Sequence, residues 1–235
     1  MNRLQRELVR LYGSGGQTAP QRALVLEVAR PADWATVGAT WQGVQNELGL
    51  SAPAIAVNGK DGYQLWFALS EALPPAEGQA FLRGLQRSYL AEVAAKRVTC
   101  WFDPGAASVW PATPNLLPEG EHWSAFVAPD LAPIFAAEPW LDIPPGDDAQ
   151  ADTLIGLRCM ATADVRSALN QLVLPVATDS AASTQTPAAD MPAPTDGAAA
   201  PPLSPRDFLH QVMRDPGVPM ALRIEAAKAL LPFEH

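Results

Sequence analysis

The spacing of apolar and polar positions predicts a packed α+β region in the first two thirds of the chain. Residues 23–29 are apolar except for Glu27, which is typical of a central strand carrying one carboxylate that needs a partner. A helix is predicted to follow, because Asp33 is a good N-cap and Gly49 marks an end. Its apolar face consists of Trp34, Val37, Trp41, Val44 and Leu48.

The pattern then predicts strands at 54–57, 63–69 and 97–102, and a second helix from Pro74-Pro75 to Val93. The order is strand, helix, strand, hairpin turn, strand, helix, strand. This order indicates a ferredoxin-like or RRM-like split βαβ core, in which an antiparallel sheet carries both helices on one face. The other face of the sheet is then free to bind a ligand.

Weaker patterns flank this core. An amphipathic helix is predicted over residues 2–12, and another helix over 163–172. Between them, short apolar runs separated by prolines suggest further strands that extend the sheet or wrap its edge. These runs are Val109-Trp110, Trp123 to Val127 and Leu154 to Met160.

Composition divides the chain into four parts. Residues 1–21 form an N-terminal helix and arm, and residues 22–176 form the main domain. Residues 177–205 are rich in Ala, Pro and Thr with little to bury, which predicts a disordered linker. Residues 206–235 read as a helical tail that is too short for its own core, so we expect this tail to dock on a protein partner.

Charge and cysteine content limit the function classes. A net charge of -9 excludes binding to nucleic acid by bulk positive charge, although a local basic groove is compatible with it. Cys100 and Cys159 lack zinc-site spacing, which favours free thiols in a reducing compartment. Since no long apolar run or signal sequence is evident, we expect a cytoplasmic protein without a membrane partner.

The turn at Asn58-Gly59-Lys60-Asp61-Gly62 has two interpretations. Its glycines permit close approach of a ligand to the backbone, and Lys60 supplies a cation beside a bound phosphate. The same residues are also typical of a tight β-hairpin with the lysine in solvent. Trp66, Trp101 and Trp110 also have two interpretations, since tryptophans can stack on bases or pack in the core. His122 is either a general base or a surface residue.

Three segments together resemble the archaeo-eukaryotic primase superfamily, which includes plasmid and phage primase-polymerases. They are the strand around Glu27, the turn with NGKDGYQLWF, and the strand ending at Asp103. The resemblance covers about residues 22–105. It implies nucleotide binding by Asn58, Gly59, Lys60, Gly62 and Gln64. It also implies that Glu27 and Asp103 are catalytic acids that hold Mg or Mn.

The chain departs from that family at two positions. Ala29 stands where the family has a second acid on the first strand, and Gln64 stands where it has a histidine. Two carboxylates are few for two-metal phosphoryl transfer. We therefore expect the fold of a metal-dependent nucleotidyltransferase (DNA primase or polymerase) whose catalysis is weakened or lost. Such a protein would bind nucleotide or nucleic-acid ends in phage or plasmid replication.

Two alternatives stay open at this stage. The first is a non-enzymatic adaptor with a ferredoxin-like core and a C-terminal helical docking segment, in which Glu27 and Asp103 are incidental. The second is an active enzyme that recruits a third acid, such as Asp61 or Asp142. The tail from Asp207 to His235 also weakly resembles helical segments of phage packaging and mobile-element proteins.

Overall fold

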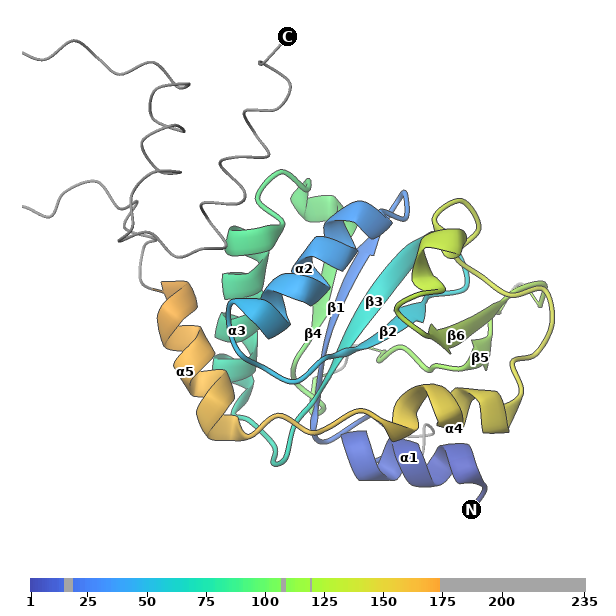
Figure 1. Cartoon of the computed structure of the whole chain (residues 1–235), viewed down its shortest axis with the longest axis horizontal. Helices are drawn as coiled ribbons and strands as arrows, with labels where there is room; N and C mark the ends of the chain where they lie inside the picture. The colour runs from blue at the N-terminus through green and yellow to red at the C-terminus, as the bar shows by residue number, and fades with distance from the viewer. Residues whose placement is uncertain (15–18, 107–108, 119, 174–235) are drawn as a thin grey trace, which may run out of the picture. The chain divides into compact units, whose positions relative to one another are not determined.

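The computed structural model describes residues 1–14, 19–106, 109–118 and 120–173, and the predicted linker and tail lie outside these residues. The described part is an α+β fold with a six-stranded antiparallel sheet of order β4-β1-β3-β2-β6-β5 (Figure 1). The strands are β1 (Ala23–Ala29), β2 (Ala54–Val57), β3 (Gly62–Ala68), β4 (Val98–Trp101), β5 (Asn115–Leu116) and β6 (Trp123–Val127). The α+β class with an antiparallel sheet is thereby confirmed.

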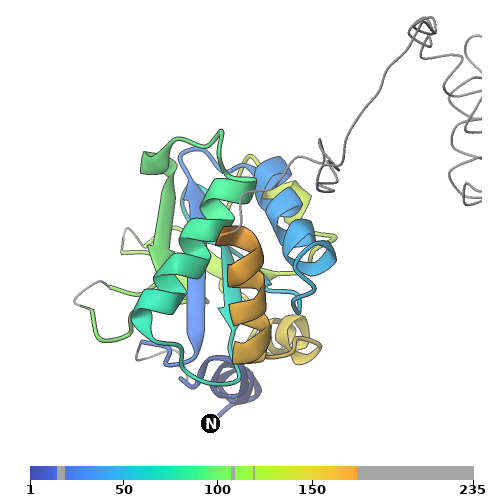
Figure 2. The ribbon, with the colours of Figure 1, turned by 90° about the vertical axis from the view of Figure 1, so that its left-hand side faces the viewer.

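Helices cover both faces of this sheet. The α-helices are α1 (Arg3–Tyr12), α2 (Trp34–Asn46), α3 (Pro75–Tyr89), α4 (Asp147–Ile155) and α5 (Thr162–Val173), and the 3-10 turns are η1 (Ala95–Arg97) and η2 (Ala132–Phe135). Side chains of α2, α3, α5 and η2 join one apolar cluster with Leu24, Leu26 and Phe67 of the sheet. The ribbons of α2, α3 and α5 lie beside one another in Figure 2. The two helices that follow β1 and β3 therefore lie on the same face.

The opposite face carries a second apolar cluster, so the expectation that it is free was wrong. Leu8 and Tyr12 of α1 and Leu154 of α4 pack there against Trp66 of β3 and Phe126 of β6. The aromatic rings form a compact group, with centroids 5.4 Å apart for Tyr12 and Trp66 and 5.7 Å apart for Trp66 and Phe126. Because alternate residues of β1 and β3 are apolar on both sides, this face must also be covered.

Most helices and strands were predicted within a few residues, and the exceptions lie after β4. The apolar run at 154–160 is not a strand: α4 ends at Ile155, and beyond it only Met160 makes an isolated bridge, to Leu69. Val109 and Trp110 are irregular and are held by indole hydrogen bonds to backbone oxygens. Short apolar runs do not separate strand from helix by pattern alone, which explains the error.

The side chain of Gln150 hydrogen-bonds to the backbone of β6 beyond the end of β5. The amide oxygen of Gln150 accepts a hydrogen bond from the backbone N–H of Phe126 at 2.7 Å, and its amide nitrogen donates to the Phe126 carbonyl at 2.9 Å. Gln150 is buried on α4. One side chain thus makes both of the bonds that a further residue of β5 would make.

No helix in the described ranges has the length and hydropathy needed to cross a bilayer.

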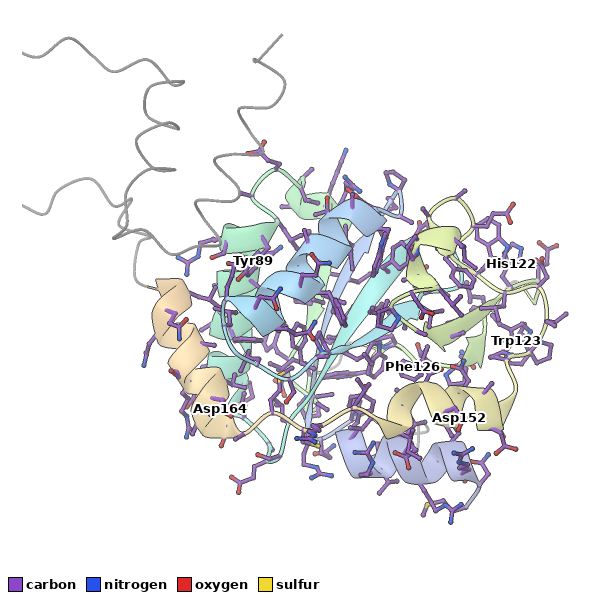
Figure 3. All side chains as sticks on the ribbon, in the orientation of Figure 1. Tyr89, His122, Trp123, Phe126, Asp152 and Asp164 are labelled. Atoms are coloured by element: carbon purple, nitrogen blue, oxygen red, sulfur yellow. The ribbon has the colours of Figure 1, made fainter. Side chains whose placement is uncertain are left out.

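Charge is unevenly distributed along the chain. Residues 98–157 contain no Lys or Arg but nine acids, which are Asp103, Glu119, Glu121, Asp130, Glu138, Asp142, Asp147, Asp148 and Asp152. Asp152 lies on α4 at the side of the molecule away from α3 (Figure 3).

Gly59→Ala should destabilise the protein far more than Gly49→Ala, although both glycines have positive φ. A Cβ at Gly59 would lie 2.2 Å from Leu117 Cδ1 and 2.8 Å from the Ser124 nitrogen, whereas nothing lies within 4 Å at Gly49. We expect a loss of about 1 kcal/mol for Gly49→Ala and about 3 kcal/mol for Gly59→Ala, measured by urea unfolding. Equal losses would mean that steric contact at Gly59 has no effect.

Candidate functional site at the end of strand β1

The sequence-predicted site residues converge only in part, around the carboxylate of Glu27. In the sheet register Glu27 lies opposite Gln64 of β3 on one side and Thr99 of β4 on the other. Gln64 Nε2 donates a hydrogen bond to Glu27 Oε2 at 2.8 Å, and Gln64 Oε1 accepts one from Trp66 Nε1 at 2.9 Å. Trp66 thus fixes the orientation of the Gln64 amide, which holds the carboxylate.

Burial dominates the electrostatics of Glu27. It raises the pKa of this carboxyl above its ordinary value of 4.5, and the negative charge of Asp61 acts in the same direction. Hydrogen bonding from Gln64 and Asn58, together with the charge of Arg30, opposes the rise in pKa. Gln64 is only 3% exposed, so its amide serves the Glu27 carboxylate and Trp66.

The glycine-rich turn is organised by the side chain of Asn58. Its Oδ1 accepts hydrogen bonds from the backbone N–H groups of Lys60, Asp61 and Gly62, each at 2.9 Å, and its Nδ2 donates to Asp61 Oδ1 at 3.2 Å. The N–H of Gly59 donates to the Pro139 carbonyl. The backbone donors that a phosphate would need are therefore occupied by the protein itself.

Packing within the protein accounts for both glycines of the turn. Gly59 approaches Ser124, as described above. A Cβ at Gly62 would lie 2.6 Å from the Cβ of Ala29 and 2.7 Å from the Val28 carbonyl oxygen. Ala29, at the position of the family's second acid, is itself buried against this glycine. The sequence alone could not distinguish this internal close approach from an approach by a ligand.

Four cations gather around this end of β1. Arg30 has a positive φ of 58° and donates from its guanidinium to the Lys96 carbonyl, while its N–H bonds the Asp61 carbonyl at 3.0 Å. Arg97 donates to the carbonyls of Ala29 and Pro31 and lies 3.7 Å from the carboxylate of Asp33. Lys60 and Lys96 are exposed. Sequence reasoning missed the role of Arg30, Lys96 and Arg97, because their proximity depends on the pairing of β4 with β1.

Asp103 is not brought to Glu27. Thr99 is the residue of β4 that faces Glu27, and Asp103 follows four residues later, which corresponds to about 13 Å along an extended chain. Its carboxylate accepts a hydrogen bond from the N–H of Gly105. Across the described ranges no three His, Cys, Asp or Glu side chains are grouped so that they could hold a metal ion. Metal binding by Glu27 and Asp103 stays a prediction without geometric support.

The remaining candidates have structural surroundings of their own. His122 stacks on Trp140 with ring centroids 4.5 Å apart and lies 3.7 Å from Asp142, in the region of β5 and β6 (Figure 3). Trp66 is a core residue. Trp101 and Trp110 are half-buried, and each donates its indole N–H to a backbone oxygen. Cys100 and Cys159 are unpaired and half-buried.

Comparison with known proteins adds no assignment, because no protein-family model, curated protein or solved structure matches the chain.

Asn58→Ala should destabilise the protein, since three backbone N–H groups lose their acceptor. We expect a loss of at least about 2 kcal/mol in the free energy of unfolding, measured with urea. Asn58→Asp retains an acceptor and should recover part of the loss. Asn46→Ala, at the exposed end of α2, is the matched control with little expected effect. An unchanged stability for Asn58→Ala would contradict the role of this amide in the turn.

Glu27→Gln should raise the stability of the protein at neutral pH. With a folded-state pKa above 4.5, the wild type binds its proton more tightly when folded. The contribution of Glu27 to stability is therefore greatest below pH 4.5 and is lost as pH rises through the folded-state pKa. Thermal unfolding should show Glu27→Gln more stable by about 3 °C at pH 7.5 and equal to wild type near pH 4.

Glu121→Gln, at an exposed position, serves as the control for the loss of one negative charge. A lower midpoint for Glu27→Gln at pH 7.5 would mean that the ionised carboxylate is stabilised in the fold by a stronger partner than Gln64.

Proposed function

We propose that the chain is a primase-polymerase-like protein without nucleotidyl transfer, which binds phosphate groups of nucleotides or nucleic-acid ends. The proposal includes a ferredoxin-like or RRM-like core formed by β1, α2, β2, β3, α3 and β4. The strand order β4-β1-β3-β2 and the two helices on one face support this finer description of the fold. The setting in phage or plasmid replication rests on the sequence resemblance alone.

The observation that carries the proposal is the arrangement at the end of β1. A partly buried carboxylate accepts a hydrogen bond from an amide there, and Arg30, Lys60, Lys96 and Arg97 belong to the segments that meet at this strand end. Cations around a strand end favour a ligand that bears phosphate. Two-metal transfer needs clustered carboxylates, and among the described residues Asp61 is the one carboxylate that affects the pKa of Glu27. The geometry therefore favours binding over catalysis.

The binding surface should lie at the rim of the sheet, since α1 and α4 occupy the opposite face of its centre. The four cationic side chains at this rim differ in whether they are held by hydrogen bonds. Arg30 and Arg97 are held by backbone carbonyls, whereas the two lysines are exposed with no side-chain partner in the described residues. Lys60 and Lys96 are thus the residues available to meet a phosphate directly.

A non-enzymatic adaptor is the second candidate function. One observation favours it, namely that β4 ends the sheet with its outer side unpaired by the described residues. The docking role predicted for residues 206–235 lies outside the described part of the chain.

The full-length protein should bind a fluorescein-labelled DNA hairpin with a recessed 3′ end, measured by anisotropy. Lys60→Glu combined with Lys96→Glu should weaken binding by at least about tenfold and flatten its dependence on salt. Arg6→Glu, at an exposed position on α1, should have little effect. Binding that is insensitive to the lysine substitutions would refute the proposed surface.

In the same preparation, a primer-extension assay with magnesium or manganese should give no product above background. Metal-dependent extension that Glu27→Gln abolishes would overturn the non-catalytic assignment and support an active enzyme, with Asp61 as the nearest second carboxylate.

A further inference from the structure

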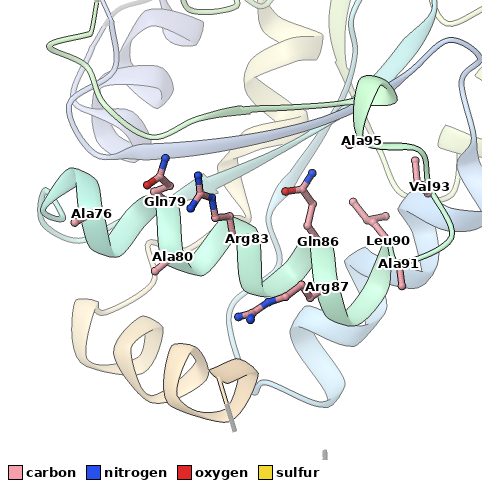
Figure 4. A pocket seen from close by; sticks show the side chains of 10 residues that line it. All are labelled: Ala76, Gln79, Ala80, Arg83, Gln86, Arg87, Leu90, Ala91, Val93 and Ala95. Carbon is pink, nitrogen blue, oxygen red and sulfur yellow. The ribbon is translucent and has the colours of Figure 1, made fainter. Parts of the chain in front are cut away.

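A groove of about 740 Å³ runs along α3 and reaches Ala95 of η1. Its volume lies within the usual range for ligand sites. The polar side chains that line it are Gln79, Arg83, Gln86 and Arg87, and the rest of the lining is aliphatic, from Ala76, Ala80, Leu90, Ala91, Val93 and Ala95. Gln79, Arg83 and Gln86 extend from the side of α3 that faces the segment of β4, while Arg87 leaves the helix on the side of α5 (Figure 4).

The two arginines of the groove differ from most others in the described residues. Arg3, Arg10, Arg97 and Arg166 form ion pairs, and Arg22 and Arg30 donate to backbone carbonyls. Arg83 and Arg87 are exposed and have no hydrogen bond or ion pair within the described part of the chain. Two unpaired guanidinium groups in one groove favour an anionic ligand.

Arg83 connects the groove to the edge of the sheet. Its charge opposes the effect of burial on the thiol of Cys100 in β4, where burial raises the pKa to about 11. β4 is the terminal strand. The Val98 N–H donates to the Ala95 carbonyl, and outside β1 no backbone hydrogen bond joins residues 99–101 to other described residues. Backbone donors and acceptors of residues 99–101 are therefore open on the outer side of β4, beside a cationic groove.

We propose that this edge binds an acidic peptide segment of a partner protein, which adds to β4 as a seventh strand with a carboxylate facing Arg83. This interaction site uses other side chains than the phosphate-binding surface proposed above and does not depend on that proposal. An extended peptide between a helix and an edge strand gains affinity from main-chain hydrogen bonds and specificity from alternate side chains.

The spacing of the groove residues suits such a strand. Alternate residues of a strand lie about 6.7 Å apart, and residues four apart on a helix rise by about 6 Å. Gln79 and Arg83 are four residues apart, and Gln86 follows after a rise of about 4.5 Å. Successive side chains on one face of the added strand can therefore meet Gln79 and Arg83 in turn, and Gln86 lies closer to Arg83 than the strand repeat.

The lining also favours a peptide over a single-stranded nucleic acid. Binding of single strands combines cations with aromatic side chains on which the bases stack. None of the ten lining residues is aromatic. The aliphatic floor and the amides instead suit the backbone and short side chains of an extended peptide.

The test uses full-length protein and a fluorescein-labelled octapeptide of alternating Glu and Val, in which all carboxylates lie on one face of a strand. Anisotropy should show saturable binding, weakened at least tenfold by Arg83→Glu and strengthened by Gln86→Lys. Because a misfolded variant would bind the peptide more weakly, tighter binding by Gln86→Lys cannot result from misfolding. Arg6→Glu is the matched arginine control and should stay within about twofold of wild type. Hydrogen exchange should slow at the amides of residues 98–101 when the peptide is bound.

Three results would overturn the proposal. They are binding of the peptide that Arg83→Glu leaves unchanged, binding without slower exchange in β4, and no binding of the peptide at about 1 mM, a concentration at which even weak complexes form. A twelve-residue oligo-dT is tested in parallel. If only the oligonucleotide binds, with the same sensitivity to Arg83→Glu, then the groove is a nucleic-acid site and the peptide assignment is wrong.

Discussion

The fold depends on the burial of the two central strands, β1 and β3, on both of their faces. Every residue of β3 is buried, and in β1 only Glu27 is partly accessible. A sheet with one polar face would need helices on one side only. Here the second face carries Val25, Trp66 and their apolar neighbours, so α1 and α4 are needed to cover it. Glu27 is the one carboxylate of these two strands, and a neighbouring strand provides its partner.

That partner illustrates how a polar position is accommodated in such a sheet. The Gln64 amide has one hydrogen-bond donor directed at Glu27 and one acceptor directed at Trp66. A histidine at the same position would have to satisfy both neighbours with one ring. Gln64 therefore serves two neighbours within the protein, the Glu27 carboxylate and the Trp66 indole.

The strands and helices between residues 23 and 101 were predictable because each has a strong local pattern. Asp33, for example, caps α2 as expected and accepts a hydrogen bond from the Thr36 N–H. The regions after β4 were less predictable. In α4 the buried residues Gln150, Ala151 and Leu154 include a polar one, so its pattern does not indicate an amphipathic helix.

The candidate site was predictable only as a set of residues. The proximity of Glu27 and Gln64 depends on the register of β1 against β3, which are separated in sequence by α2 and β2. The use of Asn58 as an internal acceptor could not be predicted, because Asn-Gly turns occur with and without it. The placement of Asp103 depended on the register of β4 against β1, which no local pattern defines. The groove along α3 was missed because exposed arginines on a helix look the same in sequence with or without a ligand.

Gln150 also affects how copies of this protein can associate. Growth of a continuous intermolecular sheet needs two pairing edges on each molecule, so that every added copy offers a new edge to the next. Beyond the two residues of β5, the hydrogen-bonding groups of Phe126 on β6 are already used by the Gln150 amide, whereas β4 is open in the described structure. Pairing through β4 can therefore join two molecules about a two-fold axis, and the assembly then stops.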